Sequence, residues 1–161
     1  MLTNAQLLTL KAAILADPTL SAQPMTSDGA FVIAEAFNLN ANPNFTVWKT
    51  NVLVREIGDN FVGTELSGLS SLNHTRLQTV AIFSTEGVNP SLPDRRAMFD
   101  DIFSGAGGAG TRAKLLILWK RLATRFEKLY ATGTGSDVVP ATMILEGKLS
   151  YFDVELARIA V

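Results

Sequence analysis

The sequence predicts a mainly α-helical protein, a small helical bundle with an extended irregular arm near its C-terminus. Three observations support this prediction. Apolar residues recur at helical spacing in most segments, helix-capping and helix-stopping residues separate those segments, and no partner strands are evident. The 161 residues are 47% hydrophobic and 18% charged, with a net charge of -1, which excludes a disordered chain and suits a single domain covering residues 1–161.

The N-terminal part of the chain predicts two helices joined by loops. Residues 3–17 carry leucines and Ile14 at helical spacing, and the Asp17-Pro18 step ends this helix. Residues 30–37 form the second helix, because their aromatic and alanine side chains fall on one face. The asparagine-rich segment 38–45 favours turns over regular structure.

The segment 46–57 is ambiguous. It is rich in β-forming residues, but the spacing of Trp48, Val52 and Ile57 also fits a buried helix. We predict a helix here, because the surrounding elements are helical.

Two further helices are predicted before a glycine-rich hinge. Residues 67–85 have an apolar face and stop at Glu86-Gly87. A Pro-Asp pair in the first turn begins the next helix, which ends at Ser104. The glycine-rich string 105–110 is interpreted as a flexible hinge between helices.

The longest predicted helix begins with Thr111 as its cap and runs to about Ala131. On a helical wheel, one compact stripe is apolar: Leu115, Leu118, Trp119, Leu122, Phe126 and Leu129. A basic stripe lies beside it: Lys114, Arg121, Arg125 and Lys128. The basic stripe is either the solvated flank of a core helix or a docking surface for an acidic partner, which would be another protein or packaged DNA.

The segment 132–149 is predicted to be an extended arm, followed by a terminal helix over residues 150–161 that Ser150 caps. The arm begins with Gly, Thr and Ser, so we expect it to be poorly ordered in the free chain. The middle of the arm, residues 138–145, is apolar enough to require burial. It would pack either against the helical bundle of its own chain or against a neighbouring subunit. The candidate inter-subunit contacts are Val138, Val139, Pro140, Met143, Ile144 and Leu145.

No coherent active site is visible in the sequence. The absence of cysteine excludes disulfides and cysteine nucleophiles, and one histidine, His74, cannot build a His-rich metal cluster. The string 105–110 matches G-x-G-x-x-G, but a helical segment precedes it where a dinucleotide fold needs a strand, and Thr111 stands where a P-loop needs lysine. We therefore expect no enzymatic activity, no cofactor and no metal site.

Membrane and export signals are also missing from the sequence. Lys11 interrupts the first apolar stretch, and the longest uncharged apolar run elsewhere, 115–119, is far shorter than the ~20 residues that cross a bilayer. We expect a protein that is made in the cytoplasm and has no membrane partner.

Distinctive strings occur in four parts of the chain: residues 24–30, 47–50, 123–135, and 140–143 with 146–151. They resemble a widespread family of small tailed-bacteriophage proteins encoded among the virion morphogenesis genes. The resemblance covers nearly the whole chain, and none of its strings is a catalytic motif. It implies a structural protein of the phage head or neck, located in the virion after synthesis in the host cytoplasm.

The first hypothesis from this resemblance is a head-to-tail connector, an adaptor or neck subunit that forms a homo-oligomeric ring beneath the portal. Its implied partners are the portal, other head, neck and tail proteins, and packaged DNA through non-specific contact. Phage neck proteins are commonly small and mainly helical, and they clasp their neighbours with extended arms, which suits the basic stripe and the apolar arm. The alternatives are a head decoration or minor capsid protein, and a small phage DNA-binding accessory protein.

Overall fold

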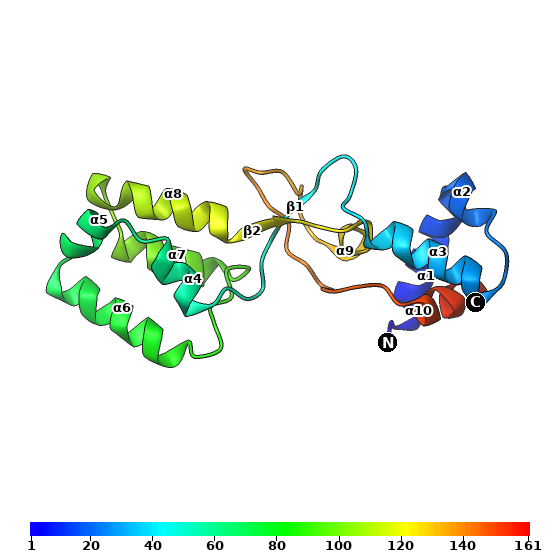
Figure 1. Ribbon diagram of the computed structural model, residues 1–161, viewed down its shortest axis with the longest axis horizontal. Helices are drawn as coiled ribbons and strands as arrows, with labels where there is room; N and C mark the ends of the chain where they lie inside the picture. The colour runs from blue at the N-terminus through cyan, green and yellow to red at the C-terminus, as the bar shows by residue number, and fades with distance from the viewer. The chain divides into compact units, whose positions relative to one another are not determined.

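The computed structural model describes residues 1–161 and is mainly helical (Figure 1), which confirms the predicted fold class. Ten α-helices, one short 3-10 helix and one two-stranded sheet make up the chain. In order, the elements are α1 (Asn4–Ala16), α2 (Pro18–Ser21), α3 (Ser27–Asn38), β1 (Thr46–Trp48), α4 (Val54–Asp59), α5 (Gly63–Ser67), α6 (Ser71–Phe83), α7 (Pro93–Ile102), η1 (Ala106–Gly108), α8 (Ala109–Leu118), β2 (Lys120–Leu122), α9 (Arg125–Tyr130) and α10 (Tyr151–Ile159).

The chain packs as two compact units, each with its own hydrophobic core. Unit 1 combines Met1–Thr46 with Leu122–Val161, and unit 2 is the continuous segment Val47–Arg121. Unit 2 is therefore an insertion in the sequence of unit 1. The sequence predicted a single domain over residues 1–161, because no change in composition marks either point where the chain passes between the units.

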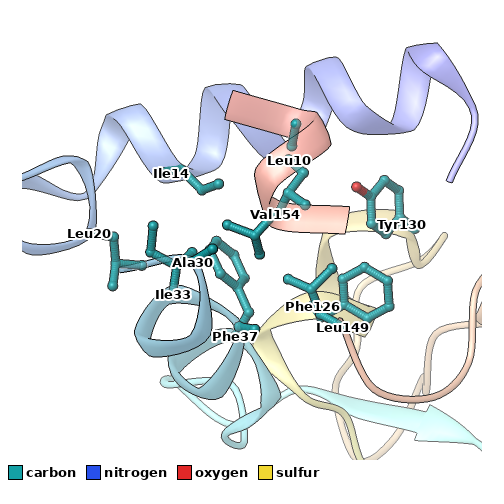
Figure 2. Close-up of a cluster of buried hydrophobic side chains, with 12 residues drawn as sticks. Leu10, Ile14, Leu20, Ala30, Ile33, Phe37, Phe126, Tyr130, Leu149 and Val154 are labelled. Carbon is teal, nitrogen blue, oxygen red and sulfur yellow. The ribbon is translucent and has the colours of Figure 1, made fainter. Parts of the chain in front are cut away.

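The core of unit 1 forms where α1, α3, α9 and α10 meet (Figure 2). The helix α3 begins at an N-cap, Thr26, whose side chain accepts from the Gly29 amide, and it buries its Ala30, Ile33 and Phe37 face. Val154 of α10 lies against this face, as Figure 2 shows. Burial of each large apolar side chain contributes about 1.5–3 kcal/mol, so this packing dominates the stability of unit 1.

The core of unit 2 is rich in aromatic residues. Phe99 of α7 meets Trp119 edge to face, with ring centroids 5.5 Å apart, and Phe103 lies 5.1 Å from Phe61. Leu115 of α8 is fully buried in the same cluster. Such aromatic pairs stabilise the core beyond the burial of their apolar surface, because the edge of one ring and the face of the other carry opposite partial charges.

A carboxylate from a neighbouring helix caps the start of α8. The two oxygens of Glu65 accept from the amides of Gly110 and Thr111, at 2.9 and 2.7 Å. The Thr111 hydroxyl accepts from the Val62 amide at 3.0 Å, so Thr111 lies inside α8 and ties it to the start of α5. The prediction that Thr111 caps this helix is wrong, because α8 already begins at Ala109.

The prediction of one helix over residues 46–57 is also wrong. Residues Thr46–Trp48 form β1, which pairs with β2, and helix begins only at Val54. The strand is buried along its whole length, which suits its β-branched and aromatic residues. The sequence contained the competing β signal, but the partner strand lies more than seventy residues away in the chain.

The single long helix predicted from Thr111 to Ala131 is divided into α8, β2 and α9. Trp119 ends α8, and its carbonyl accepts from the Lys49 amide at 2.8 Å. The helix resumes at a capping box, in which Thr124 and Glu127 satisfy each other's backbone amides. A cap at this position opens a new helix, so the apolar spacing that continues from α8 into α9 does not belong to one helix.

The remaining helix predictions differ from the structure in their bounds. The predicted helix 3–17 is α1, with Thr3 as its cap, and 30–37 is part of α3. The segment 67–85 contains α6 only from Ser71, because the Ser70 side chain caps that helix by accepting from the Asn73 amide, and Ser67 is the last residue of α5. The glycine string joins α7 to α8 through the short helix η1, and Ser150 caps the terminal helix α10 as predicted.

Candidate partner-binding surfaces

The four residues of the predicted basic stripe lie on three elements. Lys114 is on α8, Arg121 on β2, and Arg125 and Lys128 are on α9. The first two belong to unit 2 and the last two to unit 1. The prediction that they line one helix face is wrong because the helix is interrupted, and their role in binding stays a prediction.

Arg125 and Lys128 border a surface pocket of about 380 Å³ in unit 1. The guanidinium of Arg125 lies 2.9 Å from the Asp17 carboxylate and 5.1 Å from the centre of the Phe37 ring. The ammonium of Lys128 lies 5.4 Å from the centre of the Phe45 ring. Both cations therefore have aromatic contacts within unit 1, which hold them in place at the edge of the pocket.

The ion pair decides which of these two charges is available to a ligand. The hydrogen bond from Arg125, followed by that from the Leu20 amide, lowers the pKa of Asp17 below its ordinary value of 3.8, so this carboxylate is ionised near neutral pH. Arg125 is thus compensated by a neighbouring charge, whereas Lys128 is the stronger candidate for an anionic partner. One ammonium beside a guanidinium that is already paired makes a weak contact for phosphate or carboxylate.

The arm, residues 132–149, has no helix, but it is hydrogen-bonded to unit 1. Thr132 and Thr142 exchange both backbone hydrogen bonds, at 2.8 and 2.9 Å. The Thr46 amide donates to the Gly135 carbonyl at 2.7 Å, and the Ala141 amide donates to the Thr46 carbonyl at 2.9 Å. The predicted extended shape is therefore present. The expected disorder of the free chain stays a prediction, and this backbone pairing argues against it.

The six candidate contact residues of the arm fall into two groups. Pro140 and Met143 are buried, and Leu145 packs partly against the core of unit 1. Val138 is 90% exposed, Val139 56% and Ile144 64%. The exposed three are the part of the arm that is free to contact a partner.

Sequence reasoning missed an apolar surface on α8. Leu115 and Trp119 point into the core of unit 2, so the opposite side of the helix carries Ala113, Leu116 and Ile117 into solvent. Ile117 is 73% exposed. All residues of the run 115–119 are apolar, whereas the buried face of a helix needs only some of them. This surplus of apolar residues was the signal in the sequence that predicted an exposed apolar surface.

A groove between α6 and α7 was also missed. It has a volume of about 470 Å³. Its apolar lining comes from Val80, Ala97 and Met98, and its polar lining from Thr75, Arg76, Thr79, Asp94 and Asp101. Asp94 and Asp101 are the acidic part of this lining, and no group of three or more metal-ligating side chains in the structure is close enough together to hold an ion.

No helix in the structure has the length and apolar character needed to cross a bilayer. No protein-family model, no curated protein and no solved structure matches the chain.

Proposed function

We propose that this protein is a structural subunit of a tailed-bacteriophage virion, a head-to-tail connector that forms a homo-oligomeric ring beneath the portal. The proposal joins the family resemblance of residues 24–30, 47–50, 123–135 and 140–151 to one structural observation. That observation is the amount of large apolar side chain left in solvent on both units.

Exposed apolar residues support an assembly role because isolated ones are common, whereas groups of them mark protein contacts. In unit 2 the group is the outer side of α8, with Leu116 and Ile117. In unit 1 it is the arm, where Val138, Val139 and Ile144 are exposed on a segment whose backbone is held by hydrogen bonds. A held segment with free apolar side chains binds a neighbour at a lower entropy cost than a disordered one.

The test is the location and copy number of the protein in purified phage particles. Quantitative mass spectrometry, with the portal as the internal standard, should give about a dozen copies per particle, and immunolabelling should place them at a single vertex, as a closed ring requires. Copies on the order of hundreds, spread over the shell, would instead identify a decoration or minor capsid protein.

Absence from particles would also contradict the proposal. Together with retention on DNA that weakens steeply as salt rises, it would identify the DNA-binding accessory protein, since phosphate contacts release counterions. The division of the basic stripe between α8, β2 and α9 removes the helix face on which that alternative was based.

A further inference from the structure

The outer side of α8 forms a ridge, defined here as Ala113, Leu116 and Ile117 with Lys114 beside them. Its spacing of i, i+3 and i+4 is that of a helix face that packs into a groove. The guanidinium of Arg112 donates to the carbonyls of Phe103 and Gly105, which hold it there, so it is not part of the ridge. Lys114 is exposed, so the ridge is apolar with one cation at its edge.

The groove between α6 and α7 has the complementary composition. Asp94, Ala97, Met98 and Asp101 follow one another at i, i+3, i+4 and i+7, so they share one side of α7. That side of α7 is acidic at both ends and apolar in the middle. Arg76 of α6 also lines the groove, so its two carboxylates outnumber its one guanidinium and the lining is acidic on balance. Val80 of α6 completes the apolar floor, and the volume of about 470 Å³ is within the range of pockets that hold a substantial ligand.

The dimensions of the two helices also match. Lys114 and Ile117 are three residues apart, or about 4.5 Å along the helix axis, and Ala97 is three or four residues from either aspartate of the groove, about 4.5–6 Å. When Ile117 lies over the middle of the groove, Lys114 therefore comes level with one aspartate, whichever way α8 runs. Charge and apolar surface match at the same time.

The ridge and the groove of one molecule cannot meet each other. Both belong to unit 2, and α8 and α6 lie on opposite sides of α7 in Figure 1. The buried face of α8, with Leu115 and Trp119, is used by the core of the same unit. The partner that fits the groove is the α8 ridge of a second copy of this chain.

We infer that copies of this protein associate head to tail, with the α8 ridge of one copy in the α6–α7 groove of the next. The contact joins two different surfaces, so each added copy presents a free ridge at one end and a free groove at the other. Because α8 and α6 lie on opposite sides of α7 in Figure 1, repetition of such a contact gives a closed ring or an open filament. This inference rests on the proposed function, because it names the surfaces that would build the ring.

The natural chain has no cysteine, so the contact is tested by disulfide trapping with introduced pairs. Ile117→Cys places a thiol on the ridge and Ala97→Cys places one in the groove. Both positions are exposed, so the fold tolerates the changes, and circular dichroism of each variant verifies this. The matched control replaces Ala97→Cys by Gln78→Cys, an exposed position of α6 that does not line the groove.

The expected result under mild oxidation is a mixed disulfide dimer when the two single variants are combined, and a ladder of multimers from the Ile117→Cys, Ala97→Cys double variant. Its yield should exceed that of the Gln78 control by about tenfold or more, since docking raises the effective thiol concentration to the millimolar range. Adding Lys114→Glu should lower the yield, and adding Asp94→Lys and Asp101→Lys as well should restore it.

Equal yields from the Ala97 and Gln78 pairs would overturn the inference. Dimers of Ile117→Cys alone, at the yield of the mixture, would also overturn it, because they would mean that two ridges meet. The outcome is separable from that of the proposed function. If the multimer ladder forms but the protein is absent from phage particles, the contact between copies is supported and the connector role is refuted. If the protein is found at one vertex but no ladder forms, the connector role is supported and this contact is refuted.

Discussion

Two leucines of the same predicted helix should differ sharply when each is shortened to alanine. Leu115 is fully buried in the core of unit 2, whereas Leu122 is 38% exposed on β2. Removing three buried carbons from Leu115 loses about 2.4 kcal/mol of transfer free energy. The cavity left among rigid aromatic rings raises the total cost to about 3–4 kcal/mol. At Leu122 no closed cavity forms, and the partial burial limits the loss in unfolding free energy to about 1.5 kcal/mol.

The tryptophans make this difference measurable. The chain has two, Trp48 and Trp119, and both lie in the core of unit 2. Tryptophan fluorescence in a urea titration therefore follows unit 2, while far-UV circular dichroism follows both units. Leu115→Ala should lower the midpoint of the fluorescence transition by at least about 1 M urea, for m-values of about 1–3 kcal/mol/M.

The result that refutes this reasoning is the reverse order. A continuous helix with Leu118 and Leu122 in the core predicts that Leu122→Ala costs ~2–5 kcal/mol. If Leu122→Ala is the more destabilising change and Leu115→Ala is close to neutral, the interruption of the helix at Trp119 is wrong, and so is the exposure of the ridge.

Three further outcomes follow from unit 1. Gly135→Ala should destabilise unit 1 by about 1–3 kcal/mol in thermal unfolding. The reason is that φ of Gly135 is +65° and an added Cβ would lie 2.2 Å from the Phe45 ring. An unchanged melting temperature would mean that the arm does not pack against Phe45. The amide of Thr142 should be protected from hydrogen exchange in the free chain, since it donates across the arm; rapid exchange would restore the picture of a disordered arm. Burial raises the pKa of Tyr130 from 10.0 to about 12, and its hydroxyl donates to the Gln6 carbonyl at 2.8 Å. The folded state thus favours the neutral phenol, whose contribution to the free energy of unfolding is present below pH 10 and is lost as the pH rises through about 12. Part of the fall in melting temperature at alkaline pH should therefore be missing in Tyr130→Phe. An identical fall in the variant would assign it to other groups.

Local signals were sufficient to predict half of the ten helices: α1, α3, α6, α7 and α10. Ser150 and the Pro-Asp start of α7 act on their own first turns, so their effects can be derived from a few adjacent residues. The Thr124-x-x-Glu127 capping box is equally local and was available, but the apolar spacing on both sides of it favoured one long helix. A cap inside a periodic pattern should therefore be treated as a helix boundary.

The parts that could not be predicted depend on contacts between distant residues. The three residues of β1 become a strand because β2, far along the chain, supplies the hydrogen bonds. The cap of α8 comes from Glu65, which no local rule connects to Gly110. The candidate surfaces follow the same division: the arm could be named from composition, whereas the groove between α6 and α7 exists only once the two helices pack.

The insertion of unit 2 within unit 1 has a consequence for synthesis on the ribosome. Unit 2 is one continuous segment, so its core can close without any residue of unit 1 once that segment is free to fold. The core of unit 1 cannot close at that stage, because α1 and α3 pack against Val154 and Ala157 of α10, which follow unit 2 in the chain. Until α10 has been made, the apolar faces of α1 and α3 therefore lack part of their cover.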